Sequence, residues 1–250
     1  GRYEDVNGNG RVDYADVEIR DCGDVPVVTT DVEATGDRIR ETVRAVAEES
    51  FPVVLGGGHY LTYPSFCGVA AAHGDQLGLI HLDAHSDVYG PEKRHGEHWH
   101  GSPMNLIADT DHGGYGTHSM VGLRAREAPD FPAFVEEEGL HVSYARDVRE
   151  RGILPCLEDA IDHATDGVDA VYLTVDIDVV DPTVAPGTGT PEFCGLDADQ
   201  LLTAMGRLGD CESICAVDLV EVAPRLDPSR TTQRLGAAAV SRFLESAFGA

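Results

Sequence analysis

Basic residues are scarce in this chain of 250 residues, and lysine is almost absent. Lys93 is the single lysine, and 18 Lys and Arg residues stand against 44 Asp and Glu residues, so the formal net charge is −26. Such a chain repels polyanions, and we expect neither nucleic acid nor anionic membranes as partners. The acidic residues are scattered along the chain. With so little lysine, this favours a halophilic protein over an ordinary acidic one.

Long apolar runs and Cys-x-x-Cys pairs are also missing. No run approaches the roughly 20 apolar residues that span a bilayer, and the sequence shows no charged-then-apolar leader. We therefore expect a soluble, cytoplasmic protein. The cysteines are predicted to be buried free thiols in a reducing compartment. They are Cys22, Cys67, Cys156, Cys194, Cys211 and Cys215.

Three predicted strands are followed by side chains that bind metals. The apolar runs 52–55, 77–82 and 170–175 are bounded by Gly or polar residues, which is typical of buried strands. In open parallel α/β sheets, functional sites lie beyond the carboxyl ends of the strands, so we expect these side chains to lie close together. They are His59 after the first run, Asp83, His85 and Asp87 after the second, and Asp176 and Asp178 after the third.

These six residues predict a metal site. Two histidines and four aspartates form a mixed nitrogen and oxygen donor set that suits Mn²⁺ or a similar divalent cation. A structural zinc site is not expected, because no cysteine is among them. Each residue alone reads as a helix cap or a loop residue. Six of them at three strand ends are too many for caps, and clustered carboxylates repel one another unless a cation lies between them.

Predicted strands and helices alternate along the chain. This alternation predicts a single domain over residues 1–250, with a three-layer α/β/α fold and a mainly parallel central sheet. Further strands are expected over 17–24, 118–123, 140–144 and 213–219. Helices are expected over 35–50, 63–73, 103–108, 129–138, 153–164, 197–208 and 231–248.

Residues 5–16 have the pattern of a calcium-binding loop. Oxygen-bearing side chains stand at loop positions 1, 3, 5, 9 and 12, with glycine at position 6. Position 12 is Asp16 instead of glutamate, and no helix-forming segment precedes the loop. A Gly- and Asn-rich turn that leads into a strand is the favoured interpretation, and a Ca²⁺ site is the alternative.

Taken together, the segments resemble the ureohydrolase family of arginases, agmatinases and guanidino-acid hydrolases, in order and spacing, from about residue 15 to the end. This implies an arginase-like fold. The matching segments are Gly-Gly-Gly-His at 56–59, Asp-Ala-His-Ser-Asp at 83–87, His-Gly-Ser-Pro at 100–103, Thr-Val-Asp-Ile-Asp-Val-Val-Asp-Pro at 174–182 with its continuation to 196, and Asp-Leu-Val-Glu-Val-Ala-Pro at 218–224.

The resemblance implies two metals per chain, Mn²⁺ or alternatively Ni²⁺. Two cations about 3.5–4 Å apart lower the pKa of a shared water molecule, which gives a strong nucleophile for the poorly electrophilic guanidinium carbon. One metal would be held by His59, Asp83, Asp87 and Asp176. The other would be held by Asp83, His85, Asp176 and Asp178, so that Asp83 and Asp176 bridge.

The catalytic residues implied are His100, Glu221 and Asp87. His100 would protonate the leaving amine, because imidazole titrates in the useful range. Its loop also contains His95 and His98, and the Gly-Ser-Pro that follows His100 distinguishes it. Asp87 is counted among both the metal ligands and the catalytic residues.

Glu221 ends its own apolar strand and would pair with the substrate guanidinium. A salt bridge to Arg225 is the alternative.

The chain departs from the family pattern in four places. Gly58 stands where an acidic residue usually precedes the first histidine. Tyr89 stands where arginases carry an asparagine for the amino-acid end of the substrate. The residues 104–106 (Met-Asn-Leu) stand where hydrolases of guanidino acids carry basic residues. The family's initial strand and Gly-rich segment are absent, so we expect either a shortened chain or a sheet that lacks this element.

The sequence therefore predicts an enzyme, a hydrolase of linear amidines that releases urea from a small cationic guanidino substrate, as an agmatinase does. A guanidine or alkylguanidine hydrolase and a guanidino-acid amidinohydrolase are the alternatives. A pseudoenzyme subunit that partners an active paralogue is an alternative of another class. A related zinc deacylase is not favoured, because it needs adjacent histidines and the sequence has none. We expect a homo-oligomer, either a trimer or a hexamer.

Overall fold

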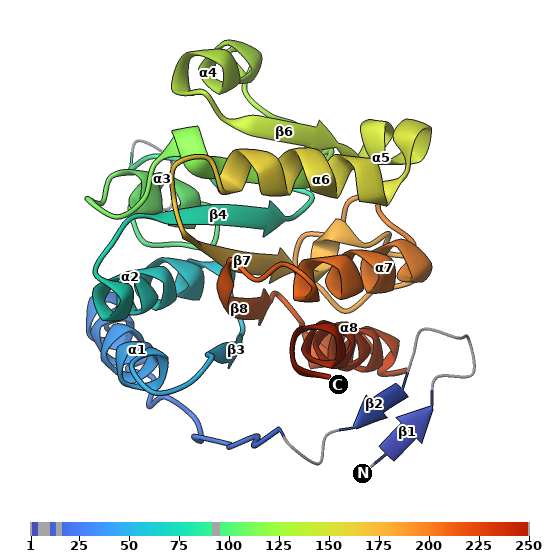
Figure 1. The fold of residues 1–250 in the computed structure, drawn as a ribbon. Coiled ribbons are helices and arrows are strands. Elements are labelled where there is room, and N and C mark those ends of the chain that lie inside the picture. Colours follow the sequence, from blue (N-terminus) through green and yellow to red (C-terminus); the bar gives the residue numbers. More distant parts are fainter. Residues whose placement is uncertain (1, 5–10, 14–16, 92–95, 250) are drawn as a thin grey trace.

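A six-stranded parallel sheet forms the centre of the protein (Figure 1). The computed structural model describes residues 2–4, 11–13, 17–91 and 96–249. The strand order is β3-β8-β7-β4-β5-β6. The strands are β3 (Val53–Leu55), β4 (Leu77–Leu82), β5 (His118–Leu123), β6 (His141–Tyr144), β7 (Ala170–Asp176) and β8 (Ile214–Val220).

Helices cover both faces of this sheet, as the alternation of elements predicts. Helices α1, α2 and α3 share one hydrophobic core with the sheet, and α6, α7 and α8 share the other. The helices are α1 (Val32–Ala47), α2 (Thr62–His73), α3 (Pro103–Ala108), α4 (Phe131–Glu138), α5 (Ala145–Arg151), α6 (Ile153–Ala164), α7 (Ala198–Gly209) and α8 (Thr231–Phe248). The three-layer α/β/α fold is therefore confirmed.

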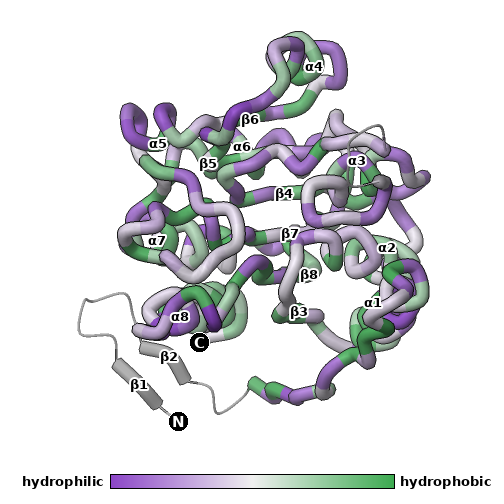
Figure 2. Tube along the Cα trace, turned by 180° about the vertical axis from the view of Figure 1, so that it is seen from behind, coloured by the Kyte–Doolittle hydropathy of each residue, from purple (hydrophilic) through white to green (hydrophobic). Residues whose placement is uncertain are grey.

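Alternate residues of each central strand face opposite cores. In β4, Leu77 and Leu79 pack against α1, α2 and α3, whereas Ile80 and Leu82 pack against the other face. Such full burial contributes roughly 1.5–3 kcal/mol per large apolar side chain. The outer helices are mixed, and Figure 2 shows hydrophilic residues interrupting the hydrophobic ones along α1 and α8. None of the described helices is long and apolar enough to cross a membrane.

Helix ends follow the expected local chemistry. Asp197 caps α7 and forms a capping box with Gln200, which accepts from the Asp197 N–H. Asp227 accepts hydrogen bonds from the backbone N–H and the hydroxyl of Thr232 in the first turn of α8. The Thr232 hydroxyl in turn accepts the Gly187 N–H, so this cap also holds the loop that follows β7.

The N-terminal part of the chain differs from the sequence-based expectation. Residues 17–24 form no strand, and Ile19 is 68% exposed. An alternating pattern alone does not make a strand, because the backbone also needs a neighbour with which to form hydrogen bonds. Two short strands that were not expected, β1 (Arg2–Glu4) and β2 (Arg11–Asp13), form an antiparallel pair. Most of the calcium-loop pattern at 5–16 lies outside the described residues.

Two smaller expectations also need correction. The six cysteines are free, but only Cys156 is buried. Cys22 and Cys194 are exposed, and the other three are partly buried. Helix α5, which follows β6 directly, was not anticipated. It begins with Asp147 accepting the Tyr144 N–H.

Candidate metal centre

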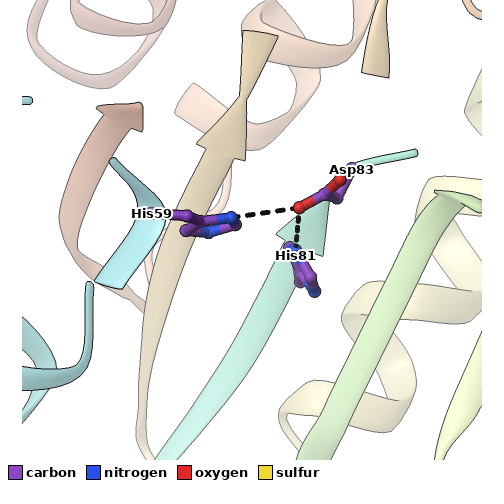
Figure 3. Close-up of side chains that lie close together, drawn as sticks. All are labelled: His59, His81 and Asp83. Atoms are coloured by element: carbon purple, nitrogen blue, oxygen red, sulfur yellow. Dashed lines mark hydrogen bonds and ion pairs between the residues drawn. The ribbon is translucent and has the colours of Figure 1, made fainter. Parts of the chain in front are cut away.

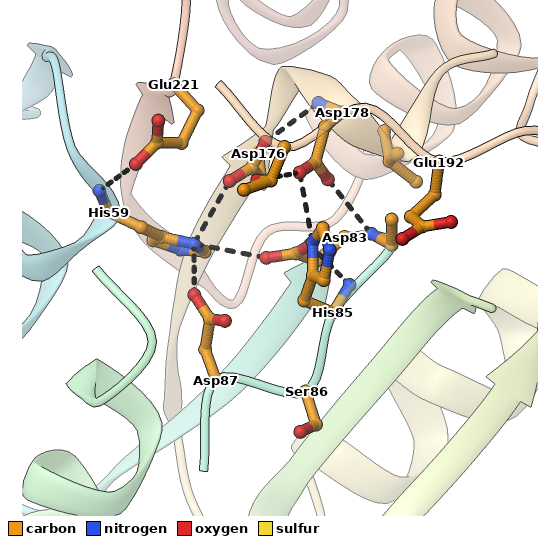
Figure 4. Close-up of polar contacts among 12 residues, drawn as sticks. His59, Asp83, His85, Ser86, Asp87, Asp176, Asp178, Glu192 and Glu221 are labelled. Carbon is orange, nitrogen blue, oxygen red and sulfur yellow. Dashed lines mark hydrogen bonds and ion pairs between the residues drawn. The ribbon is translucent and has the colours of Figure 1, made fainter. Parts of the chain in front are cut away.

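All six predicted metal ligands lie at the carboxyl ends of β3, β7 and β4, of which β7 and β4 are neighbours and β3 is separated from β7 by β8 (Figure 4). His59 begins the single-turn helix His59–Leu61 that follows β3, and Asp176 is the last residue of β7. Asp83, which directly follows β4, is 2% exposed, and four of the other ligands are exposed by at most 5%. His85 is less buried, with 19% of its side chain exposed. The sheet therefore brings the two halves of the predicted site together.

His59 faces three carboxylates. Its Nδ1 atom lies 3.0 Å from Oδ2 of Asp87, 3.1 Å from Oδ2 of Asp83 and 3.3 Å from Oδ2 of Asp176. These four residues are the ones that the resemblance assigned to the first metal.

His85 faces the other carboxylates. Its Nδ1 atom lies 3.0 Å from Oδ2 of Asp178 and 3.4 Å from Oδ1 of Asp83. Asp83 thus presents one oxygen to each histidine, which is the arrangement that a bridging carboxylate requires. One oxygen of Asp176 accepts the Asp178 N–H at 2.7 Å, so bridging by Asp176 stays a prediction.

Crowding of the carboxylates changes their protonation. Burial and the neighbouring charge of Asp83 raise the pKa of Asp87 to about 7 and that of Asp178 to about 6. Burial, together with Asp178 and Asp83, raises the pKa of Asp176 well above its usual range. Burial opposes protonation of His85, but Asp178 and Asp83 outweigh it and raise its pKa to about 11. Without a metal, protons therefore take part of the place of a cation.

The hydrogen bonds of His59 show that the site fits a metal. Thr174 donates its hydroxyl hydrogen to Asp218 at 2.6 Å, so the Thr174 oxygen, 3.0 Å from Nε2 of His59, accepts the Nε2 hydrogen. In the neutral ring, Nδ1 then carries the lone pair, and it is buried without a hydrogen-bond partner. Burial opposes protonation of His59, but Asp176, Asp83 and Asp87 outweigh it and raise its pKa well above the usual value, so a positive charge, either a proton or a metal cation, is favoured between Nδ1 and the three carboxylates. The donor set and its orientation therefore fit a divalent metal.

A third histidine, His81, also lies in this group (Figure 3). Burial lowers the pKa of His81, so the ring is neutral, and its Nε2 donates to Oδ2 of Asp83 at 2.7 Å. An Nε2 atom that carries a hydrogen does not ligate a metal. His81 instead orients the carboxylate that both histidines of the site share.

The chain matches known proteins along nearly all of its length. The match to the Arginase family covers residues 2–245. Formimidoylglutamase of Halalkalibacterium halodurans is 31% identical over 240 residues, which cover 94% of this chain and 74% of that protein. Mitochondrial agmatinase of Gallus gallus is 35% identical over 233 residues, which cover 91% and 66%. The chain belongs to the arginase family.

Solved structures of the arginase family share the fold. Formimidoylglutamase of Bacillus subtilis has a TM-score of 0.84 at 26% identity and covers 90% of this chain and 71% of its own. Formiminoglutamase of Trypanosoma cruzi, described with Mn²⁺, has a TM-score of 0.86 at 22% identity, with 96% and 79% covered. Arginase-family proteins are binuclear-metal hydrolases of C–N bonds in linear amidines, and this chain is a hydrolase of that type.

Glu221, the carboxylate assigned to the substrate, lies at the end of β8 beside His59. Its Oε1 atom accepts the His59 N–H at 2.8 Å, and its own N–H donates to the Gly57 carbonyl. Among the ion pairs of the described residues, none joins it to Arg225. Glu221 and Asp87 have φ angles of 59° and 51°, in the left-handed region that is costly for residues other than glycine. Such strain is typical of functional sites, and no sequence pattern revealed it.

The three histidines of the 95–100 loop are placed differently. His100 is exposed and contacts the Trp99 ring edge-on. His98 pairs with Glu33 of α1 and packs against Tyr60, whereas His95 lies outside the described residues. Within the described part of the chain, His100 makes no contact with the predicted metal ligands, so its catalytic role stays a prediction.

The loop after β7, which is a hallmark of the resemblance to the arginase family, is held by Arg124. The Arg124 guanidinium donates to the carbonyl of Asp178 at 2.7 Å and to that of Glu192 at 2.8 Å, and also to the carbonyls of Gly122, Val179, Val180 and Phe193. A β-carbon at Gly195 would lie 2.5 Å from this guanidinium, so the close approach requires glycine.

Sequence reasoning missed the polar residues that support the ligands. His81, Thr174 and Asp218 all lie within buried strands. A polar side chain inside an apolar strand was the available signal, because buried polar groups need partners.

Proposed function

We propose that this chain hydrolyses a small cationic guanidino compound, with agmatine as the preferred substrate, to urea and an amine. The observation that carries the proposal is the grouping of six metal-binding side chains around Asp83, with Glu221 beside them. Guanidine, alkylguanidines and guanidino acids are the alternative substrates.

Two Mn²⁺ ions suit the donor set, and Ni²⁺ is the alternative. Bound metals of this kind activate water as a nucleophile near neutral pH. The proposed ligands are His59, Asp83, Asp87 and Asp176 for one metal and His85, Asp83, Asp178 and Asp176 for the other.

Glu221 is placed to bind the guanidinium of the substrate. Its Oε1 atom is held by the His59 N–H, which fixes the carboxylate beside the metal ligands. Gly58 and Gly189 flank the carboxylate, where β-carbons would lie 3.5 and 3.6 Å from its two oxygens. An acidic residue at position 58 would therefore stand against Glu221, and glycine leaves this face open to a planar cation. A carboxylate that pairs with a guanidinium gives charge-assisted, directional hydrogen bonds.

The surroundings of Tyr89 support a substrate without a carboxylate tail. The Tyr89 hydroxyl donates to Oε2 of Glu127 at 3.1 Å, and the Ser86 N–H donates to the other oxygen of Glu127 at 3.2 Å. A carboxylate thus lies against the metal-ligand loop, near the position where arginases carry an asparagine for the amino-acid end. Met104 and Leu106 pack into the core and supply no positive charge. An anionic tail would be repelled here, and an ammonium tail attracted.

Release of urea from a panel of guanidino compounds tests the proposal. The panel contains agmatine, arginine, 4-guanidinobutyrate, guanidine and methylguanidine, with formimidoylglutamate assayed by formamide release, in molar KCl with Mn²⁺ or Ni²⁺. We expect the highest kcat/KM with agmatine. The Glu127→Gln variant should narrow the preference for agmatine over 4-guanidinobutyrate, whereas Glu192→Gln, which removes a half-buried carboxylate of the loop after β7, serves as a charge-matched control. Fastest turnover of a substrate with a carboxylate tail would refute the assignment, and no turnover would favour a pseudoenzyme.

The role of His100 is tested by exchanging the histidines of its loop. His100→Asn should leave the metal content and the substrate affinity nearly unchanged, because His100 is assigned as a proton donor and not as a ligand. Turnover should fall by roughly 10²–10⁴-fold, the usual effect of losing a general acid or base. His98→Asn is the matched control and should have a far smaller effect, since His98 contacts Glu33. If His98→Asn is inactive and His100→Asn is active, His98 and not His100 is the proton donor.

A further inference from the structure

A buried carboxylate that is not assigned to either metal lies beneath the centre. Asp218 is in β8 on the sheet face that packs against α2, and it is fully buried. It accepts three hydroxyl hydrogen bonds. Oδ1 accepts from Thr174 at 2.6 Å, and Oδ2 accepts from Thr62 and Tyr172, both at 2.8 Å.

The two oxygens of Asp218 serve different parts of the molecule. Thr62 begins α2 and Tyr172 lies in the core, so the contacts of Oδ2 join structural elements. Thr174, which binds Oδ1, is the residue whose oxygen also meets Nε2 of His59. A series of hydrogen bonds therefore links Asp218, through Thr174, to His59, a predicted metal ligand.

The donors and acceptors in this series of hydrogen bonds are fixed by the carboxylate at its end. A carboxylate only accepts, so Thr174 must donate to Asp218. The Thr174 oxygen is then left to accept the Nε2 hydrogen of His59, so in the neutral, metal-binding form of the ring the lone pair is on Nδ1, which faces the carboxylates.

We propose that Asp218 is a positioning residue, which acts through Thr174 to fix the ring and the tautomer of His59 and so sets the affinity of the metal site around His59. The inference rests on the proposed binuclear centre. Among the described residues, His85 contacts Asp83 and Asp178 and takes no part in the hydrogen bonds that link Asp218, Thr174 and His59. The effect of Asp218 should therefore be confined to one of the two metals.

Calorimetric titration of the metal-stripped full chain with Mn²⁺ tests the inference. Wild type should bind two ions, and the variants His59→Asn and His85→Asn identify the binding step that belongs to each histidine. Thr174→Val removes the acceptor of the Nε2 hydrogen, and Asp218→Asn leaves one acceptor oxygen for three hydroxyl groups. Both variants should weaken the His59 step by roughly 10–100-fold, the usual cost of losing such a partner. The His85 step should be unchanged.

Two matched variants separate positioning from folding. Thr174→Ser keeps the hydroxyl and should restore the affinity of the His59 step. Tyr172→Phe removes a partner of Oδ2 but not of Oδ1, so it should lower the melting temperature without changing Mn²⁺ affinity. Melting of each metal-free variant shows that it is folded before titration.

The outcomes separate the inference from the function on which it rests. Unchanged affinity of the His59 step in Thr174→Val and Asp218→Asn, or an equal loss in Tyr172→Phe, would overturn the positioning role and leave the binuclear centre intact. Equal weakening of both steps would show that the effect is not confined to His59 and would overturn it as well. A wild-type chain that binds fewer than two Mn²⁺ ions would overturn both.

Discussion

Replacing Asp83 with alanine should leave the chain without either metal. Asp83 presents one oxygen to His59 and the other to His85, so its loss removes a ligand from both proposed sites. The remaining buried carboxylates would have only the two histidines as partners, and turnover should fall to background. Elemental analysis of the reconstituted protein measures the metal content. Retention of one metal by Asp83→Ala would show that Asp83 does not bridge.

Single-site variants provide the comparison. Asp87→Ala and Asp178→Ala should each lose one metal, because each faces only one histidine. Asp176→Ala should lose both if Asp176 bridges, and only one if its second oxygen stays with the Asp178 N–H.

Metal uptake by wild type should strengthen as the pH rises from 5 to 8, because Asp178 and Asp87, with pKa values of about 6 and 7, then lose the protons that compete with the cation.

Stability should rise steeply between low salt and molar KCl. The chain carries a formal charge of −26, and most of its described ion pairs lie on the surface, as between Arg44 and Glu48. The Debye length falls from about 30 Å at 0.01 M salt to about 3 Å at 1 M, so repulsion between surface carboxylates is screened only at high salt. The melting temperature of the metal-loaded protein, measured across this range of KCl, should increase by more than the 2–4 °C that about 1 kcal/mol produces.

The end of α4 offers a control for this prediction. Glu136, Glu137 and Glu138 are exposed in the last turn of the helix, where negative charge opposes the helix dipole. Exchanging all three for glutamine should stabilise the protein at low salt by about 1–2 kcal/mol and change little at molar KCl. A melting temperature that does not vary with salt in the wild type would exclude the halophilic interpretation.

The sequence predicted the parts of the molecule that follow from local patterns. The apolar run 77–82 forms β4, and the two aspartates that follow it reach His59 because parallel strands share one carboxyl edge. The topology of the sheet thus brings residues that are separated in the sequence into one cluster, and the six predicted metal ligands could be named from the sequence alone.

Contacts between distant residues were not predictable in this way. The spacing of 44 residues between Thr174 and Asp218, or of 41 between Ser86 and Glu127, depends on strand order and register. The strand predicted at 17–24 was wrong, because the alternation of residues was present but the described structure places no strand beside it. Positive φ angles at Asp87 and Glu221 are likewise imposed by the surrounding fold and cannot be predicted from the residue type.

Arg124 holds the loop after β7 through the backbone of the loop, which allows the side chains there to diversify. The guanidinium contacts carbonyl oxygens of that loop, from Asp178 to Phe193, and none of its side chains in these hydrogen bonds. Because these hydrogen bonds reach only the backbone, they tolerate exchange of side chains in the loop, such as the half-buried Glu192 and the 73% exposed Phe193. New substrate preferences could therefore arise by point substitution in this loop while Asp178 keeps its place.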